Sequence, residues 1–485
     1  MCGAIFSKVT FKETGYSYDD VLLVPQYSAV ASRSDVSLRV KLTKSIEIET
    51  PFVSSNMDSV TESDMAISLA QAGGIGIVHR FNSIQDQVLI IKKVKRYKNS
   101  IVQQPICIDF DASLREAKKL MQKNGITSLL IVDVEKKLTG IVTQRDIPSC
   151  EDENKKISFF MTPFNNLITG NQDTTLDEAK KILSEHKIEK LPLINSEQEV
   201  IGLITKKDIL NHKTYPKASV DSRGRFLVGA AIGTKSDALE RARFLLEADV
   251  DVLVIDIAHG HSEQTIATLK ALKAEFPEAQ VIAGNVATAE GTRDLIEAGA
   301  DAVKVGIGPG SICTTRIITG CGYPQISAIM ECAQEADKYG IPVIADGGIK
   351  VSGDIVKAFG AGASTVMLGS LLAGTDESPG MPFLKNGKKY KVIRGMASFG
   401  ANLSRNEKTT DKNNVEKYVP EGVEALVSYK GDVATIIEQL VGGIKSGMSY
   451  CGVKKLKHFR GNGIFVPMTS SGLRESRVHD VSELS

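Results

Sequence analysis

The sequence contains no tryptophan, and its seven cysteines form no Cys-x-x-Cys pair. The lack of such a pair argues against a zinc site or a thioredoxin-like redox motif. No run approaches about 18 consecutive apolar residues, so we expect no membrane span. The N-terminus has no basic segment followed by an apolar core. A secretory signal is therefore not expected, and the sequence predicts a cytoplasmic protein.

An excess of either charge is also missing, because 59 Lys and Arg residues are balanced by 58 Asp and Glu residues. Nucleic-acid-binding proteins usually carry a basic excess, so no nucleic-acid partner is expected. Apolar residues make up 42% of the 485 residues and charged residues 24%, as in globular proteins. This length suits about three domains of roughly 150 residues each, although a (β/α)₈ barrel takes about 250 by itself.

Eight short apolar runs recur along the chain, each ending in or near Gly, Ser, Asn or Asp, and most are followed by a helical pattern. Continuous apolar runs are typical of strands buried on both faces, and alternation with helices indicates parallel pairing. The pattern predicts an α/β fold, a closed (β/α)₈ TIM barrel with its site at the C-terminal strand ends. An open doubly wound sheet is the alternative. The runs are 51–57, 74–79, 227–233, 252–260, 281–287, 302–308, 342–348 and 365–370.

The interval between the second and third runs contains an internal repeat. Residues 114–147 align without gaps with residues 176–209, at a constant offset of 62. Each copy has the pattern of a helix, two strands and the start of another helix. Two copies can bury each other's apolar faces, as structural repeats do. The interval therefore predicts a separate inserted domain.

This repeat resembles a tandem pair of CBS (cystathionine-β-synthase-type) modules. It divides the chain into a first barrel part (1–97), a regulatory insert (98–214) and a second barrel part (215–485). The Thr-x-x-Asp ending resembles the ribose-contacting motif of that family, which implies a purine nucleotide effector. Thr143 and Thr205 are also candidate N-caps of the following helices, and the two roles are compatible. The resemblance places the effector at Thr143, Asp146, Thr205 and Asp208.

The segment GIGPGSICTTRIITGCGYPQ (306–325) follows a predicted barrel strand and carries the candidate nucleophile, Cys313. Its glycines permit backbone conformations that side chains forbid, and they leave amides and carbonyls free to meet a ligand or ion. Cys313 lies among Ser311, Thr314 and Thr315, whereas a structural thiol usually has apolar neighbours. A buried structural cysteine is the alternative here, and it is what we expect of most of the other cysteines.

Two further strand ends suit a phosphate and a ribose. Asp346 lies in ADGGI (345–349), where its carboxylate could accept two ribose hydroxyls. Glycines after the seventh and eighth strands of a barrel are a common phosphate site, because backbone amides can approach the oxygens. Tight turns would explain Gly347, Gly348 and Gly369 equally well, but they would not explain the aspartate.

These segments together resemble the IMP dehydrogenase/GMP reductase family. The resemblance covers nearly the whole chain, including the CBS insert, and implies a barrel enzyme whose loop cysteine attacks C2 of a purine nucleotide. A nicotinamide cofactor, NADPH or NAD, then exchanges hydride with that carbon. Family members are typically homotetramers that can stack into octamers. The matching segments are SSNMDSVTE (54–62), GGIGIVHR, GPGSICTTR, ADGGIKVSGDI (345–355), MLGSLLAGT, RGMAS (394–398) and VPEG (419–422).

The resemblance also implies roles for individual positions. Phosphate and ribose would contact Ser311, Asp346, Gly348, Gly369 and Ser370, and the base would contact Gly395, Met396, Ala397 and Ser398. The nicotinamide side would be formed by Asp256, Asn285, Gly306 and Gly308. The family's potassium site matches the carbonyls of Gly308, Gly310 and Cys313, completed by a neighbouring subunit's Glu475, Ser476 and Arg477.

The segment 400–422 decides between the two branches of the family, and its charged, Asn-rich sequence predicts a mobile flap. The dehydrogenase converts IMP to XMP and activates water with an Arg-Tyr pair, but Thr409 and Thr410 stand at that place here. The reductase converts GMP to IMP and ammonia and needs a proton donor for the leaving amine. Thr315 and Glu421 match its Thr/Glu relay.

The sequence therefore favours a GMP reductase, with IMP dehydrogenase as the alternative. The CBS insert and the tail RESRVHDV (474–481) resemble the dehydrogenase. Some protist GMP reductases nevertheless keep such an insert, and IRGMASFGAN (393–402) resembles theirs. We weigh catalytic residues above accessory architecture, because function lies in sites rather than folds. A catalytically idle nucleotide sensor is disfavoured by the intact GPGSICTTR segment.

Overall fold

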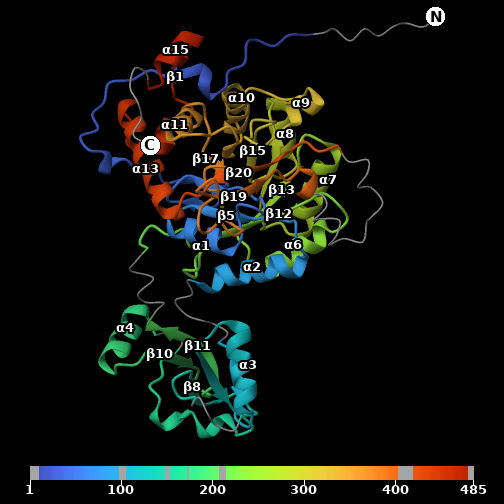
Figure 1. Ribbon diagram of the computed structural model, residues 1–485. Helices are drawn as coiled ribbons and strands as arrows, with labels where there is room; N and C mark the ends of the chain where they lie inside the picture. Colours follow the sequence, from blue (N-terminus) through green and yellow to red (C-terminus); the bar gives the residue numbers. More distant parts are fainter. Residues whose placement is uncertain are drawn as a thin grey trace, which may run out of the picture. The chain divides into compact units, whose positions relative to one another are not determined.

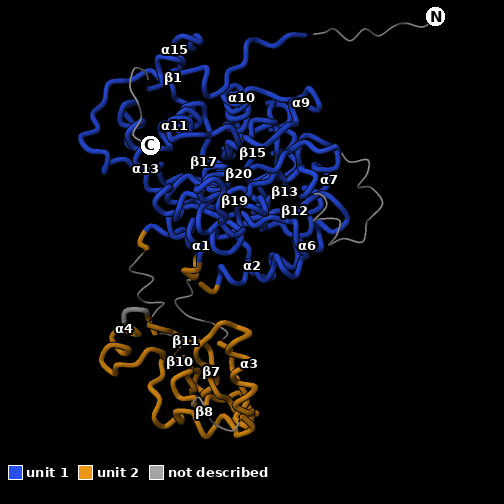
Figure 2. Tube along the Cα trace, viewed as in Figure 1, with its two compact units in different colours: residues 1–95, 217–221, 226–485 blue, residues 96–216, 222–225 orange. Residues whose placement is uncertain are grey.

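The computed structural model describes residues 10–97, 105–147, 153–171, 174–206, 215–401 and 419–478 (Figure 1). The chain divides into two compact units (Figure 2). Unit 1 comprises residues 1–95, 217–221 and 226–485, and unit 2 comprises residues 96–216 and 222–225. The expected flap residues Thr409 and Thr410 and the expected effector residue Asp208 lie outside the described residues.

Unit 1 is built on a closed parallel barrel, which confirms the predicted fold class. Its strand order is β12-β13-β14-β15-β16-β17-β4-β5, and each of the eight predicted apolar runs supplies one strand. The chain therefore enters the barrel with two strands, leaves it for unit 2 and returns with the remaining six. The strands are β4 (Phe52–Ser54), β5 (Ile75–Val78), β12 (Val228–Ile232), β13 (Val252–Asp256), β14 (Gln280–Val286), β15 (Ala302–Val305), β16 (Val343–Asp346) and β17 (Thr365–Leu368).

The barrel strands are apolar because almost every residue in them is buried. All residues of β5, β12, β15 and β17 are buried, and β13 and β16 are buried except for their last residues, Asp256 and Asp346. In β13 and β16, polarity therefore begins where the strand reaches the C-terminal end of the barrel. This arrangement places chemistry at that end and packing in the interior.

Helices follow the strands around the barrel, and several begin at a side-chain cap. The hydroxyls of Ser262 and Thr288 accept bonds from backbone amides of the first turns of α7 and α8, which satisfies donors that the helices leave unpaired. The helices of the ring are α1 (Ser63–Gln71), α2 (Ile84–Tyr97), α6 (Ala238–Glu247), α7 (Glu263–Glu275), α8 (Ala289–Glu297), α10 (Gln325–Asp337), α11 (Ser352–Gly360) and α13 (Val433–Tyr450).

Additional elements decorate the barrel. A short helix, α9 (Thr315–Thr319), lies between β15 and α10, and an antiparallel sheet of β18 (Phe383–Lys385), β19 (Lys388–Arg394) and β20 (Glu424–Ser428) lies between β17 and α13. The strand β1 (Val21–Leu23) pairs with β21 (Phe465–Pro467), which joins the N-terminal and C-terminal parts of the chain. The other elements are β2 (Val40–Lys41), β3 (Glu47–Ile48), α14 (Leu456–Phe459) and α15 (Ser470–Glu475).

Unit 2 shows the internal repeat at the level of structure. The first copy comprises α3 (Leu114–Asn124), β7 (Ser128–Val132) and β8 (Leu138–Thr143), and the second comprises α4 (Leu176–Glu185), β10 (Lys190–Ile194) and β11 (Val200–Thr205). Both helices begin with a capping box, Ser113 with Glu116 and Thr175 with Glu178. The first copy also includes β6 (Cys107–Asp109) and β9 (Thr162–Pro163) in one four-stranded sheet.

The expected effector residues lie at the ends of the repeated strands. Thr143 is the last residue of β8 and Thr205 the last of β11. The Thr143 amide and hydroxyl both donate to Asp146 Oδ2, at 2.7 Å and 2.8 Å. Residues 148–152, over which a following helix would continue, lie outside the described part of the chain, so the N-cap role of Thr143 stays a prediction.

Among the helices that the structure describes, none is both long and apolar enough to cross a membrane.

Candidate active site

Cys313 lies in the loop between β15 and α9, at the C-terminal end of the barrel, and its side chain is partly exposed. Its thiol donates a hydrogen bond to Thr315 Oγ1 at 3.1 Å. The Thr315 hydroxyl in turn donates to Glu421 Oε2 at 2.8 Å. The three side chains form one chain of donors that leads from the sulfur to a carboxylate, so a proton can leave the thiol along it.

The backbone holds Glu421 in this position. The amide of Thr314 donates to the Glu421 carbonyl at 2.9 Å, and the amide of Glu421 donates to the Ala397 carbonyl at 3.0 Å. Cys313 and Gly422 also form an antiparallel bridge. Three segments far apart in the sequence are therefore joined at the thiol: the cysteine loop, the RGMAS segment and the segment just before β20.

The other described cysteines differ from Cys313 in their surroundings. Burial raises the pKa of the Cys332 thiol to about 12 and also raises the pKa of Cys107 and Cys451. A raised pKa reduces the thiolate fraction, and only the thiolate is a good nucleophile. Of these four cysteines only Cys332 is buried, whereas Cys107 and Cys451 are partly buried and Cys321 is exposed just beyond α9. The prediction that most of them are buried is therefore wrong for the described cysteines.

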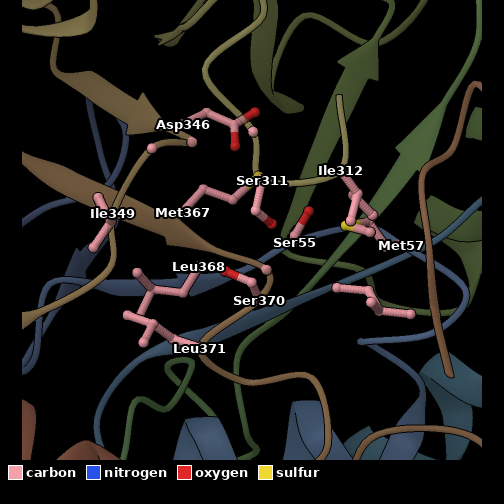
Figure 3. A pocket seen from close by; sticks show the side chains of 15 residues that line it. Ser55, Met57, Ser311, Ile312, Asp346, Ile349, Met367, Leu368, Ser370 and Leu371 are labelled. Carbon is pink, nitrogen blue, oxygen red and sulfur yellow. The ribbon is translucent and has the colours of Figure 1, made fainter. Parts of the chain in front are cut away.

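A pocket lies beside the cysteine loop and is lined by the C-terminal ends of β4, β16 and β17 and the loops that follow them (Figure 3). It brings together all five residues expected to hold a phosphate and a ribose. None of the residues expected to line the base, Gly395–Ser398, is among its lining residues, although Ile393 of β19 is. The described residues that line it are Ser55, Met57, Gly310, Ser311, Ile312, Asp346, Gly347, Gly348, Ile349, Met367, Leu368, Gly369, Ser370, Leu371 and Ile393.

A buried ion cluster lies at the ends of β13 to β16. The Lys304 ammonium donates to Asp256 Oδ1 at 3.0 Å, to Asp346 Oδ2 at 2.8 Å and to the Asn285 side-chain oxygen. Asn285 donates through Nδ2 to Asp346 Oδ2 at 3.0 Å and to the Gly306 carbonyl at 2.8 Å. The structure thus places Asp256, Asn285 and Gly306, three residues expected on the nicotinamide side, directly beside Asp346.

The opposite charges in this cluster stabilise each other's ionised forms. Burial alone would raise the pKa of Asp256, but the positive charges of Lys304 and Arg80 outweigh burial and hold it below its usual value. Burial alone would lower the pKa of Lys304, but Asp346 and Asp256 raise it well above its usual value. Asp256 and Lys304 are therefore both charged at neutral pH, as paired ions in a buried site should be.

Gly306 has a steric reason to be glycine. Its backbone φ is +150°, and a Cβ added there would lie 2.1 Å from the Asp346 carbonyl oxygen. We expect Gly306→Ala to displace Asp346, to lower the free energy of unfolding by about 1–3 kcal/mol and to raise the nucleotide KM. Thermal denaturation and steady-state kinetics measure the two effects. Gly442→Ala in α13 is the matched control, because an added Cβ there meets nothing within 4 Å, and equal behaviour of the two variants would contradict the steric account.

A family model described as "IMP dehydrogenase / GMP reductase domain" matches residues 15–479. The chain belongs to this family. Membership confirms the predicted enzyme class, an NAD(P)-dependent oxidoreductase that acts on a purine nucleotide.

Relatives from both branches of the family resemble the chain over nearly its whole length. An inosine-5'-monophosphate dehydrogenase of Nitrosopumilus maritimus is 52% identical over 475 residues, covering 97% of this chain and 99% of its own. A GMP reductase of Leishmania donovani is 46% identical over 481 residues, covering 97% and 98%. A crystal structure of a cysteine-to-alanine variant of Trypanosoma brucei GMP reductase with guanosine 5'-monophosphate has a TM-score of 0.91 at 44% identity, covering 97% and 98%.

Sequence reasoning missed several residues of this family member's site. It gave no role to Lys304, although a lysine within the apolar strand AVKV was a signal. It also gave no individual role to Ser55 and Met57, which line the pocket. Arg394 was missed as well: its Nε donates to the Asp58 carboxylate at 2.8 Å and 3.0 Å, which ties the RGMAS segment to the loop after β4.

The residues expected at the potassium site fall into two groups. Gly308, Gly310 and Cys313 share the cysteine loop, where the Gly310 carbonyl accepts the Cys313 amide at 3.1 Å. Glu475 ends α15, and Ser476 and Arg477 follow it. The amide of Met468, just before α15, donates to the Asp20 carbonyl at 2.8 Å, which places the start of this C-terminal segment beside the N-terminal part of the same chain.

Proposed function

We propose that the protein is a GMP reductase, which converts GMP to IMP and ammonia through a bond between Cys313 Sγ and purine C2. The hydrogen-bonded chain from Cys313 through Thr315 to Glu421 carries this proposal. Leaving amines need a proton, and this chain can take one from the thiol and return it to the amine. The same proton then serves both the attack and the departure of ammonia.

The residues that line the pocket support the proposed positions of the phosphate and ribose of the substrate. Ser311, Gly348, Gly369 and Ser370 line it together with Asp346, so backbone amides and hydroxyls would meet a phosphate while the carboxylate accepts ribose hydroxyls. Gly395, Met396, Ala397 and Ser398 would face the base. NADPH would supply the hydride, and Asp256, Asn285, Gly306 and Gly308 would lie on its side, beside Asp346.

IMP dehydrogenase is the second candidate, because relatives that carry this name are up to 52% identical to the chain. That reaction ends in hydrolysis of the covalent adduct and needs an activated water. The segment 398–422 contains no Arg-Tyr pair, and two threonines stand where dehydrogenases resembling this chain carry it. The hydroxyl groups of threonines cannot supply the cation or the phenolate that such activation uses.

Regulation, assembly and location extend the proposal. Trypanosoma brucei GMP reductase has been solved with guanosine 5'-triphosphate, and we propose that a purine nucleotide binds the CBS pair at Thr143, Asp146, Thr205 and Asp208. The carbonyls of Gly308, Gly310 and Cys313 suit a potassium ion, since carbonyl oxygens can replace its hydration shell. A neighbouring subunit of a cytoplasmic homotetramer would complete that site with Glu475, Ser476 and Arg477.

An absorbance assay of the purified full chain tests whether the protein is a GMP reductase or an IMP dehydrogenase. With GMP and NADPH, the absorbance of the reduced cofactor should fall, and IMP and ammonia should form in equal amounts. With IMP and NAD, we expect less than about 1% of that rate, since the sequence 398–422 contains no Arg-Tyr pair to activate the water that hydrolyses the adduct. Rapid formation of XMP from IMP, with no turnover of GMP, would establish the dehydrogenase instead.

A further inference from the structure

Lys304 lies within the barrel wall between the two halves of the proposed site. It belongs to β15, where it is level with Gly284 of β14 and Ile344 of β16, and its side chain is only 2% exposed. Gly284 leaves room for it, because a Cβ at that position would lie 2.8 Å from Lys304 Cβ. The stem is thus enclosed by the barrel, and only the ammonium reaches the strand ends.

All three N–H groups of the ammonium can be accounted for. A lysine has three donors and no acceptor, and three oxygens accept from Lys304: those of Asp256, Asn285 and Asp346. No N–H remains to bind a ligand directly or to be passed to one. The role of Lys304 is therefore to orient other groups rather than to take part in proton transfer.

The two carboxylates that share this ammonium have separate tasks in the proposed reaction. Asp346 lines the nucleotide pocket, whereas Asp256 ends β13 and is assigned to the cofactor side. Both are about one-fifth exposed, so each can still meet a ligand. Two carboxylates held around one buried point repel each other unless a cation lies between them.

We propose that Lys304 is a positioning residue that couples the nucleotide side of the site to the cofactor side. It holds Asp346 and Asp256 in fixed relative orientations, so that a substitution or a bound ligand at one carboxylate changes the position of the other. This inference rests on the proposed function for the assignment of Asp346 to the nucleotide and Asp256 to the cofactor. Such coupling is a free energy that links the two sites. It is measured by comparing the effect of two substitutions made together with the sum of their separate effects on the binding free energy.

A double-mutant cycle on nucleotide binding tests the coupling. The dissociation constant of GMP is measured by calorimetry, without cofactor, for the wild-type enzyme, Asp256→Asn, Lys304→Met and the double variant. We expect Asp256→Asn to weaken GMP binding about 5-fold and Lys304→Met about 10-fold or more, with no further loss in the double variant. An unchanged GMP affinity in Asp256→Asn, or effects that simply multiply, would overturn the proposal.

The chain offers a matched control in Lys95. It is also buried and also bridges two aspartates, Asp221 at 3.0 Å and Asp251 at 2.7 Å. Asp251 lies just before β13 and Asp256 ends it, so the two lysines serve opposite ends of one strand. Lys95→Met should lower the melting temperature but leave GMP affinity unchanged. Equal losses of GMP affinity in Lys95→Met and Lys304→Met would show a general structural effect and reject the proposal.

The coupling can still be tested if Lys304→Met does not fold or if the proposed function is wrong. If Lys304→Met does not fold, Asp256→Asn alone still decides, because an effect of a cofactor-side residue on GMP binding is required. If wild-type enzyme fails to turn over GMP with NADPH, the proposed function is wrong. The same cycle measured with IMP then still reports whether Lys304 couples the two carboxylates, and additive effects there would reject the coupling.

Discussion

Replacing Cys313 with alanine should reduce turnover of GMP with NADPH by at least about 10⁴-fold, as expected for loss of a nucleophile. Cys313 carries the only thiol in the β15–α9 loop, residues 306–314, and a thiolate is a far better nucleophile than the hydroxyls of Ser311 and Thr314. Binding of GMP should change little, because Cys313 does not line the pocket that holds Asp346 and Ser311. Steady-state kinetics and calorimetric titration with GMP measure the two effects.

The chain contains its own control for this variant. Cys321 lies eight positions further on, is exposed and has no role in the proposed reaction. Cys321→Ala should keep wild-type turnover. Mass spectrometry of acid-quenched enzyme should find a nucleotide adduct in the wild type and in Cys321→Ala but not in Cys313→Ala. Activity of Cys313→Ala above one-tenth of the wild-type rate would contradict the covalent mechanism.

Glu421→Gln should slow ammonia release by roughly 10²–10⁴-fold, the usual contribution of a positioned acid or base. Glutamine has the size of glutamate and can still accept the hydrogen bond from Thr315, but it cannot store a proton. Hydride transfer needs no proton from this chain of donors and should be spared. The variant therefore separates the two chemical steps, and Thr315→Ala should act in the same direction because it breaks the 2.8 Å link to Glu421.

Two measurements resolve these steps. Quenched-flow assays of ammonia report the first step, and single-turnover oxidation of NADPH by the preformed covalent adduct reports hydride transfer alone. Glu424→Gln is the matched control: Glu424 opens β20 three residues later and is exposed, so both rates should stay at wild-type values. If Glu421→Gln released ammonia as fast as the wild type, the relay would have no role in deamination.

The barrel and the repeat could be predicted because both follow from patterns of residues that are close in the sequence. Strands buried on both faces must be apolar throughout, so each of the eight runs corresponds to a strand of the barrel. The repeat is periodic in the sequence, and the helices and strands of unit 2 recur at the same offset. The same reasoning placed Cys313 and Asp346 at the C-terminal strand ends, since polarity begins there.

Residue types along single segments were enough to predict the architecture, the family and the chemistry expected at individual positions. The contacts that join side chains from different segments became visible only in the folded chain. Lys304 and Asp256 are 48 residues apart and Arg394 and Asp58 are 336 apart, and a hydrogen bond across such a distance leaves no periodic trace, whereas the pairing of Thr315 with Glu421 was expected only from the resemblance to the family. Contacts of that kind exist only once the barrel has closed and brought its strand ends to a single rim.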